Sequence, residues 1–384
     1  MVAAYAAGGV PRTTFTLAGE LAQRGRDVEV ISLNRSAASP RIPLDAAVTL
    51  RSIRDRYDPS TPDRPGRLPP ADRARNKQPS TLLSDGGAHP TFTALTDQGL
   101  ERLIRGRGRS VFVSTRPEFA VAASRWAAPG SVILHQEHLT FSARPARMRA
   151  ALKRLAHGDG DGIPLTALLT LTNADRDRWQ AYLGAGSCPV GMVANATPFP
   201  IGSPAPLTAS VVVAVGRLEF QKGFERLVEA WRPIAHSHPQ WQLKIFGEGD
   251  QQAQLTRQIE SAGLVGRVLL AGVTSDIESE LRRASVFAMS SRYEGLPMVL
   301  LEAMSLGVPP VAFDCPEGPR QLIRDGVNGR LVPDGDVPAL TRALTDLMDA
   351  PATRRRLGAA SQETAREYAP GPITDQWEAW ARGA

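Results

Sequence analysis

The chain has 384 residues, a hydrophobic content of 42% and a formal net charge of +6. This length is too great for one ordinary domain and suits two, and the apolar content permits complete hydrophobic cores. No apolar run is long enough for a transmembrane helix, and the two cysteines, Cys188 and Cys315, form no metal-ligand cluster and suit a reducing cytoplasm.

The first half of the chain alternates short apolar segments with amphipathic ones. A short strand over residues 2–6 runs into a glycine turn that contains Gly9, and a helix over residues 13–24 and a strand over residues 27–33 follow. Residues 54–80 are rich in Pro and Arg and poor in apolar side chains, which predicts a flexible, basic surface loop. Further strands are predicted at residues 111–114, 131–135, 166–172 and 190–195.

A second alternation begins after a Pro-rich linker over residues 198–206. The β-branched run at residues 211–215 predicts a buried strand. The next apolar residues share one helix face: Phe224, Leu227, Val228, Trp231 and Ile234. Further strands are predicted at residues 243–246, 268–270, 286–289 and 311–313. Strands separated by helices form parallel sheets, so the sequence predicts an α/β fold of two doubly wound, Rossmann-like domains that face a cleft.

Two cations follow the strand at residues 211–215. Arg217 and Lys222 lie in the loop after this strand, at the end where open parallel sheets bind ligands. A leaving diphosphate develops negative charge as its bond to a sugar breaks. Two fixed cations at this place would stabilise that charge without a metal ion.

Two carboxylates stand at a similar place later in the chain. Glu294 lies in the turn after the strand at residues 286–289, and Glu302 lies on a helix predicted over residues 297–305. The N-terminus of that helix offers unpaired N–H groups, which suit a phosphate. Carboxylates would repel a phosphate but accept hydrogen bonds from hydroxyl groups. A ligand with a diphosphate and several hydroxyls, such as a nucleotide sugar, fits both features.

Both segments resemble signatures of the retaining GT-B glycosyltransferases of glycosyltransferase family 4, also called glycosyl transferases group 1. Residues 216–223 read GRLEFQKG and resemble the signature G-R-L-x-x-x-K-G, and Glu294 and Glu302 resemble the E-x7-E signature. The resemblance implies that Arg217 and Lys222 bind the diphosphate, that Glu294 contacts the donor sugar, and that Glu302 contacts the ribose. It covers nearly the whole chain, most specifically the second half.

The resemblance also implies further site residues. Family members carry a His from the first domain near the donor sugar and phosphate, and we prefer His138 to His135, which lies at a strand end and is expected to point into the core. The expected catalytic residues are Glu294, His138, Arg217 and Lys222. The expected donor-binding residues are Gly9, Arg217, Lys222, Gly247, Val273, Glu294, Gly295, Leu296, Pro297, Met298, Val299 and Glu302. The segment from Cys315 to Pro319 resembles a loop near the donor in some branches.

The resemblance implies three parts. Residues 1–200 would form an acceptor-side domain, residues 201–364 a nucleotide-sugar-binding domain, and residues 365–384 a C-terminal helix that packs back on the first domain. The expected reaction moves a hexosyl group from a nucleoside-diphosphate sugar, such as a UDP-sugar, to an acceptor hydroxyl, with retention. No cofactor and no metal are expected. Two alternatives stay open: a nucleotide-sugar epimerase on the same fold, and a non-catalytic subunit that binds sugar nucleotides.

Three Asp-x-Asp triplets, at residues 159–161, 175–177 and 334–336, are interpreted as turns or helix starts and not as metal sites.

Positive charge is concentrated in the first half of the chain. Residues 1–198 hold 26 Lys and Arg against 17 Asp and Glu, a balance of +9, whereas residues 199–384 hold 19 against 22, a balance of −3. The basic half would suit contact with the inner face of an anionic membrane. It would equally suit an anionic acceptor, which could be a glycan, a lipid-linked molecule or a small molecule. An Arg-rich solvated surface explains the excess equally well. Nucleic acid is not expected as a partner, because no known binding motif is present.

Overall fold

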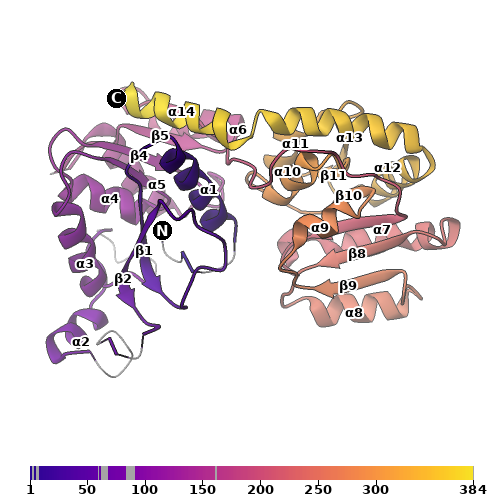
Figure 1. Ribbon diagram of the computed structural model, residues 1–384, viewed down its shortest axis with the longest axis horizontal. Helices are drawn as coiled ribbons and strands as arrows, with labels where there is room; N and C mark the ends of the chain where they lie inside the picture. Colours follow the sequence, from indigo (N-terminus) through magenta and orange to yellow (C-terminus); the bar gives the residue numbers. More distant parts are fainter. Residues whose placement is uncertain are drawn as a thin grey trace. The chain divides into compact units, whose positions relative to one another are not determined.

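The computed structural model describes the chain except for residues 2–3, 6–7, 59, 62–67, 84–90, 161 and 384. The chain divides into two compact units, which Figure 1 shows in ribbon form. The N-terminal unit comprises Met1–Ala196 together with Pro370–Ala384, and the C-terminal unit comprises Thr197–Ala369. Each unit combines helices with parallel sheets, so the predicted α/β fold is confirmed.

The C-terminal unit is built on a six-stranded parallel sheet. The strands are β7 (Val211–Val215), β8 (Gln242–Phe246), β9 (Val268–Gly272), β10 (Val286–Met289), β11 (Pro310–Asp314) and β12 (Arg330–Pro333). The helices are the 3-10 turn η1 (Phe220–Lys222), α7 (Phe224–Ser237), α8 (Gln252–Ser261), α9 (Ile277–Arg282), α10 (Met298–Ser305), α11 (Gly318–Leu322), α12 (Val337–Asp349) and α13 (Pro351–Arg366).

The strand order of this sheet is β12-β11-β10-β7-β8-β9. The chain therefore starts in the middle with β7, builds one half outward to β9, and crosses over to build the other half from β10 to β12. This is the Rossmann order, in which the direction of building reverses between the first and fourth strands. Ligands of such sheets bind at the carboxyl ends of the strands at this reversal, here between β7 and β10.

Helices cover the sheet of the C-terminal unit, and this explains its apolar strands. Val212 and Ala214 of β7 are fully buried in a core that includes Leu227 and Trp231 of α7, while the next residue, Val213, is also fully buried. A strand buried on both faces reads as a continuous apolar run and not as an alternating one. All five apolar residues predicted on one face of α7 are buried, so that prediction is confirmed.

The N-terminal unit contains a four-stranded parallel sheet and a separate two-stranded one. The pair consists of β1 (Glu29–Arg35) and β2 (Thr49–Asp55), and the larger sheet follows chain order through β3 (Val111–Ser114), β4 (Val132–Gln136), β5 (Ala167–Thr170) and β6 (Val190–Met192). The helices are α1 (Gly9–Gln23), α2 (Pro70–Lys77), α3 (Ala94–Arg105), α4 (Pro117–Trp126), α5 (Ala146–His157), α6 (Asn173–Leu183) and α14 (Pro370–Arg382).

The last helix, α14, belongs to the N-terminal unit although the C-terminal unit precedes it in the chain. It lies beside α1 (Figure 1), where Arg24, the residue after α1, forms an ion pair of 2.6 Å with Asp375 of α14. Trp377 is buried, and a Cβ added at Gly191 of β6 would lie 2.2 Å from the ring of Trp380. Glycine at this position therefore lets the indole pack directly against the strand.

Two segments, one in each unit, differ from the sequence-based expectation. The predicted basic loop at residues 54–80 is wrong in part, because β2 reaches Asp55 and residues 70–77 form α2. The strand β12 was not predicted, because it is short and half exposed. Most of the strand expected over residues 2–6 lies outside the described residues.

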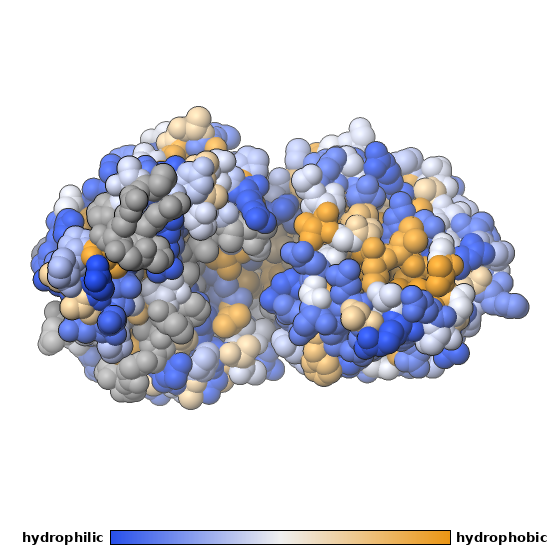
Figure 2. All heavy atoms as spheres, turned by 90° about the horizontal axis from the view of Figure 1, so that it is seen from below, coloured by the Kyte–Doolittle hydropathy of each residue, from blue (hydrophilic) through white to orange (hydrophobic). Residues whose placement is uncertain are grey.

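The surface of the C-terminal unit carries an apolar area near its edge strand β9. Figure 2 shows hydrophobic residues gathered on the underside of this unit, where Figure 1 places α8 and β9. Val265 and Val273, on either side of β9, are 71% and 67% exposed. In the described part of the chain, every helix is too short or too polar to cross a lipid bilayer.

Candidate active site

The loop after β7 carries the two predicted cations, and the structure places them in different surroundings. Arg217 follows the strand directly, has a side chain that is 68% exposed, and donates a hydrogen bond of 2.8 Å to Glu219. Lys222 ends the short turn η1, and its side chain is largely buried. Gly223, the residue before α7, has a φ of 59°, a left-handed conformation that favours glycine.

The loop after β10 brings Glu294 to Lys222. Strand β10 pairs with β7, so the loops that follow these strands start side by side at the reversal of the sheet. Lys222 Nζ lies 2.7 Å from Glu294 Oε1, and the hydroxyl of Ser291 donates to the same oxygen at 2.6 Å. Glu294 is buried. Two residues 72 positions apart in the chain thus form a shielded ion pair.

Backbone and side-chain contacts join these two loops. The N–H of Arg292 donates to Gln221 O at 2.8 Å, and the side-chain amide of Gln221 donates to Tyr293 O at 3.0 Å. The guanidinium of Arg292 donates to Phe220 O at 2.6 Å and stacks on the Phe220 ring, 3.8 Å from its centroid. These bonds fix η1, and with it Lys222, against the loop that carries Glu294.

Glu302 lies in α10 and is buried. The segment from Gly295 to Val299 connects Glu294 to the first turn of this helix. Pro297 is the residue before the helix and supplies no side-chain cap to it. The first-turn N–H groups of Met298 and Val299 therefore stand at an uncapped helix N-terminus, where the helix dipole attracts an anion.

The loops after β8 and β9 meet the loop after β7 through glycines. Gly247 has a φ of 144°, and a Cβ there would lie 1.8 Å from Gly216 O. The N–H of Gly247 donates to Gly272 O at 2.8 Å, and Val273 follows as an exposed residue. Any larger residue at position 247 would push the loops apart, so the close approach of three strand ends depends on glycine.

The loop after β11 also reaches Glu294. Residues 294 and 317 form an isolated bridge, and a Cβ at Gly318 would lie 2.0 Å from Gly295 O. Glu317 is buried with a φ of 82°, an uncommon conformation for a residue other than glycine. Burial and the nearby Glu294 carboxylate raise the pKa of the Cys315 thiol to about 12, so this cysteine is uncharged.

The sequence-based prediction of the site did not include Ser291, Arg292 and Glu317, which contact Glu294 or lie beside it. Their positions just after the strand ends of β10 and β11 were the available signal. Composition could not single them out, because serine and arginine are common in ordinary loops.

In the N-terminal unit, His138 follows β4 within a braced loop. The side chain of Glu137 is fully buried and pairs with Arg144, whose Nε lies 2.8 Å away. Burial by itself raises the pKa of the Glu137 carboxyl. The neighbouring His135 and Arg144 outweigh this effect and lower the pKa to about 2. Asp175 of α6 accepts the N–H of Phe141 at 2.9 Å, which fixes the far end of the loop.

The two histidines near this loop differ. His135 is fully buried in β4 and bonds through Nδ1 to the hydroxyl of Ser114 at 2.9 Å, so it points into the core as expected. His138 is half-buried, and its Nε2 has no hydrogen-bond partner within the described residues. Burial lowers the pKa of His138 to about 4, so the imidazole is neutral at physiological pH. Gly9 begins α1, and a Cβ added there would have none of the surveyed atoms within 4 Å.

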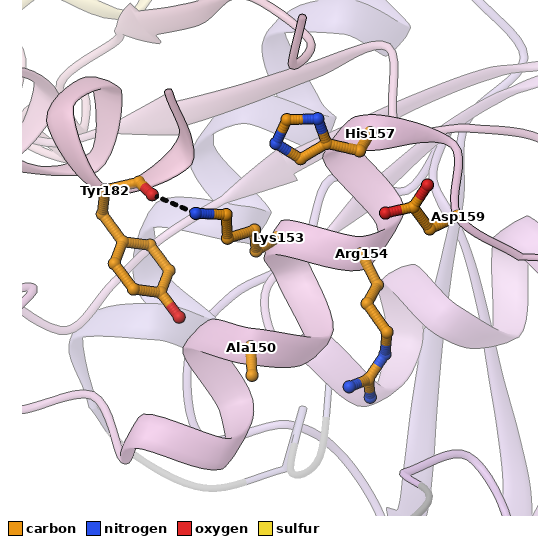
Figure 3. Close-up of a pocket in the computed structure, with 6 residues that line it drawn as sticks. All are labelled: Ala150, Lys153, Arg154, His157, Asp159 and Tyr182. Carbon is orange, nitrogen blue, oxygen red and sulfur yellow. Dashed lines mark hydrogen bonds between the residues drawn. The ribbon is translucent and has the colours of Figure 1, made fainter. Parts of the chain in front are cut away.

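A surface pocket of about 380 Å³ also lies in the N-terminal unit (Figure 3). Its lining includes Lys153, Arg154 and His157 of α5, and Tyr182 of α6. Lys153 donates to Tyr182 O at 2.8 Å, and His157 Nε2 lies 3.0 Å from Leu183 O. Lys153 and His157 therefore contact carbonyl groups at the C-terminus of α6, which is a structural role.

The Asp-x-Asp triplets serve local structure where the structure describes them. Asp175 lies in the first turn of α6, and Asp336 caps α12 by accepting the N–H of Ala339 at 2.9 Å. Asp161 lies outside the described residues. Among the residues that are described, no three His, Cys, Asp or Glu side chains gather in a group that could hold a metal ion.

Comparisons with known proteins identify the family. The family model described as "Glycosyl transferases group 1" matches residues 200–364, which include both loops of the site. The chain is 32% identical over 381 residues to the exopolysaccharide phosphotransferase SCO2592 of Streptomyces coelicolor; this match covers 97% of the chain but only 39% of that protein. It is 28% identical to the amylovoran biosynthesis glycosyltransferase AmsD of Erwinia amylovora, over 96% of the chain and 95% of AmsD.

A solved structure shares the fold. HepE of Anabaena, in complex with UDP-glucose, aligns with a TM-score of 0.71 and 16% identity over 99% of this chain and 97% of HepE. The strand order of the C-terminal unit, the loops that carry Lys222 and Glu294, and these similarities agree with one another. The chain belongs to the glycosyl transferases group 1 family, glycosyltransferase family 4, whose members are retaining enzymes of the GT-B fold that use nucleotide-sugar donors.

Proposed function

We propose that this protein transfers a hexosyl group from a nucleoside-diphosphate sugar to an acceptor hydroxyl, with retention of configuration and without a metal ion. The observation that carries the proposal is the pairing of Lys222 with Glu294 at the carboxyl ends of β7 and β10. A cation and a hydrogen-bonding carboxylate stand together at the reversal of a Rossmann sheet, where a ligand with a diphosphate and a sugar would lie.

Each part of the donor has a proposed partner in the C-terminal unit. Arg217 and Lys222 bind the diphosphate together with the N–H groups at the start of α10. Glu302 accepts hydrogen bonds from the ribose hydroxyls, and Glu294 accepts them from the sugar. The backbone after β8 and β9, at Gly247 and Val273, borders the base. Cations and N–H groups stabilise the leaving diphosphate most where its charge develops, so they lower the barrier as well as bind.

The N-terminal unit is proposed to hold the acceptor and to supply His138 and the glycine turn at Gly9. A neutral imidazole can donate a hydrogen bond to the sugar or phosphate, or accept one from a sugar hydroxyl. In the reaction the bond from the anomeric carbon to the diphosphate breaks, and a bond to the acceptor oxygen forms on the same face. The acceptor proton passes to an oxygen of the leaving diphosphate.

The acceptor is proposed to be a glycan under assembly or its lipid-linked form. The name of AmsD places it in amylovoran biosynthesis, and the name of SCO2592 describes an exopolysaccharide phosphotransferase, so both names concern polysaccharides and support this class. An anionic membrane is proposed as a peripheral partner of the basic N-terminal unit. Residues 146–157 of α5 contain five cationic or potentially cationic side chains and no Asp or Glu, and Arg147 and Arg154 are exposed.

The rival functions differ in what they need. A nucleotide-sugar epimerase would convert the donor without an acceptor, and a non-catalytic subunit would bind the donor without converting it. Incubation with a nucleotide sugar alone, followed by analysis of the sugar, separates the first rival from a transferase. Turnover of any donor excludes the second.

The diphosphate contacts are tested with Arg217→Ala and Lys222→Ala. Each variant should weaken donor binding and slow transfer by roughly tenfold to a thousandfold, the range for losing one partner of a transition-state charge. Arg232→Ala, which removes an exposed cation from α7, is the matched control and should keep wild-type kinetics. Wild-type rates in both test variants would reject the assignment.

Independence from metal is tested by dialysis of the protein against excess EDTA, followed by a transfer assay. Transfer should continue, because side chains and a helix terminus neutralise the diphosphate. Loss of activity that magnesium or manganese restores would show that a metal ion takes part.

A further inference from the structure

One oxygen of Glu294 accepts both of the side-chain hydrogen bonds that this residue receives. The Ser291 hydroxyl donates to Oε1 at 2.6 Å, and Lys222 Nζ lies 2.7 Å from the same atom. Among the described residues no side chain donates to Oε2. The donors are shielded too, since Ser291 is 1% exposed. The carboxylate is therefore held through one oxygen, and the lone pairs of the other are available to a ligand.

The two donors are not equivalent once a diphosphate is bound. Lys222 is the proposed ligand of the diphosphate, and an ammonium group shares its three N–H bonds among all anions near it. Ser291 carries no charge, so a phosphate does not compete strongly for its hydroxyl. Ser291 thus keeps its hydrogen bond to Glu294 when a diphosphate is bound, whereas Lys222 interacts with both Glu294 and the diphosphate.

The position of Ser291 makes this contact rigid. It stands two residues after the end of β10, and the preceding Ser290 donates to Lys222 O at 3.0 Å. Arg292, the following residue, is bonded to Phe220 and paired with Glu225. The backbone on both sides of Ser291 is therefore anchored to the loop after β7, so its hydroxyl reaches Glu294 from a fixed point.

We propose that Ser291 is a positioning residue for recognition of the donor sugar. Its hydroxyl fixes Oε1 of Glu294, and the orientation that results presents Oε2 to a hydroxyl group of the sugar. The proposal rests on the proposed role of Glu294 and names a residue that acts through it. A free carboxylate would sample several rotamers, and fixing one of them removes an entropic cost from sugar binding.

Ser291→Ala tests the proposal. We expect the variant to bind a nucleoside diphosphate within twofold of wild type, because neither the phosphate nor the ribose contacts change. Its affinity for the intact nucleotide sugar, and its kcat, should fall by about tenfold to a hundredfold, the range for one hydrogen bond to a charged group. The probe is the nucleotide hexose that wild type binds most tightly in a panel of UDP-, dTDP-, ADP- and GDP-glucose, with its nucleoside diphosphate as reference.

Two further variants separate positioning from general damage. Ser285→Ala is the matched control, because Ser285 is also fully buried, precedes the same strand β10, and donates its hydroxyl to a backbone carbonyl, Ala209 O. It should leave sugar affinity and kcat unchanged. Ser291→Thr keeps the hydroxyl and should recover most of the loss. In a Glu294→Ala background, Ser291→Ala should have no further effect, because both act through one carboxylate.

The outcomes are distinct. A loss in Ser291→Ala that is confined to the sugar, recovered by Thr and absent in the Glu294→Ala background, supports the proposal. Unchanged sugar affinity in Ser291→Ala, or an equal loss of nucleoside diphosphate binding, overturns it while the proposed function stands. If wild type binds no nucleoside diphosphate and transfers no sugar, the proposed function fails and this inference fails with it. If Glu294→Ala transfers sugar normally, the proposed function stands, but the role given to Glu294, and with it this inference, is overturned.

Discussion

At the scale of single residues, the charged side chains of the site are either exposed to solvent or shielded in an ion pair. Arg217 extends into solvent, whereas Lys222 and Glu294 form a shielded pair. Removing one partner of a shielded pair leaves the other charge without compensation. The roles of these residues are therefore linked, and Lys222 affects both the diphosphate and the sugar.

The two glutamates are predicted to serve different parts of the donor. Glu302→Gln should weaken binding of the nucleoside diphosphate alone, because Glu302 is the proposed ribose partner. Glu294→Gln should spare that binding and lower transfer, because an amide has one acceptor oxygen where the carboxylate has two. Calorimetry with the nucleoside diphosphate and kinetics with the full donor measure the two effects. Equal losses of nucleoside diphosphate binding in both variants would contradict this division of roles.

His138 is predicted to make stability depend on pH. Burial lowers its pKa from 6.5 to about 4, so between these values the unfolded chain binds a proton that the folded chain does not. Stability is therefore lost as pH falls through this window, by about 2 kcal/mol between pH 7 and pH 5. Glu137, with its pKa lowered to about 2, loses its contribution only below about pH 4.5.

Urea unfolding of wild type and His138→Gln, followed by tryptophan fluorescence at both pH values, measures this contribution. The variant should lose less stability than wild type when the pH is lowered. His236→Gln, at an exposed histidine, should behave as wild type. The same pH dependence in wild type and His138→Gln would show that His138 does not stay neutral in the folded protein.

At the scale of elements, glycines decide how closely the strand ends approach. Gly247→Ala should destabilise the C-terminal unit by about 3 kcal/mol or more, because its Cβ would overlap Gly216 O and its φ is strained for alanine. Gly263→Ala is the matched control. Its φ is 67° but no atom lies within 4 Å of the added Cβ, so only about 1–2 kcal/mol is expected. Thermal unfolding compares them, and equal losses would show that crowding at Gly216 is unimportant.

At the scale of the whole molecule, the uneven charge predicts binding to anionic membranes. Vesicles that contain anionic lipid should bind the protein at low salt and release it at high salt, because salt screens exposed charges. Arg147→Glu on α5 should weaken this binding by about tenfold or more, since each basic residue near the surface contributes about 1 kcal/mol. Arg257→Glu makes the same change of charge on α8 and should have a smaller effect. Absence of co-sedimentation at low salt would favour a simple solvated surface.

Much of this protein follows from local sequence patterns. The apolar runs at β7 and β10, the helix face of α7 and the two loop motifs were all recognisable, because burial on a sheet selects residues over short stretches. Elements with weak apolar patterns were not predicted. The helix α2 has no buried residue, and β2 is mostly half exposed, so neither carries an apolar signal.

The tertiary structure alone decided which of these residues meet. Lys222 and Glu294 are 72 positions apart, and only the pairing of β7 with β10 makes them neighbours. Ser291 and Ser290 are adjacent serines of equal burial, yet one bonds to Glu294 and the other to a backbone carbonyl. Sequence by itself determined the fold class and the type of chemistry, since both depend on local patterns. The partners of each side chain depend on the packing of distant segments, which no local pattern contains.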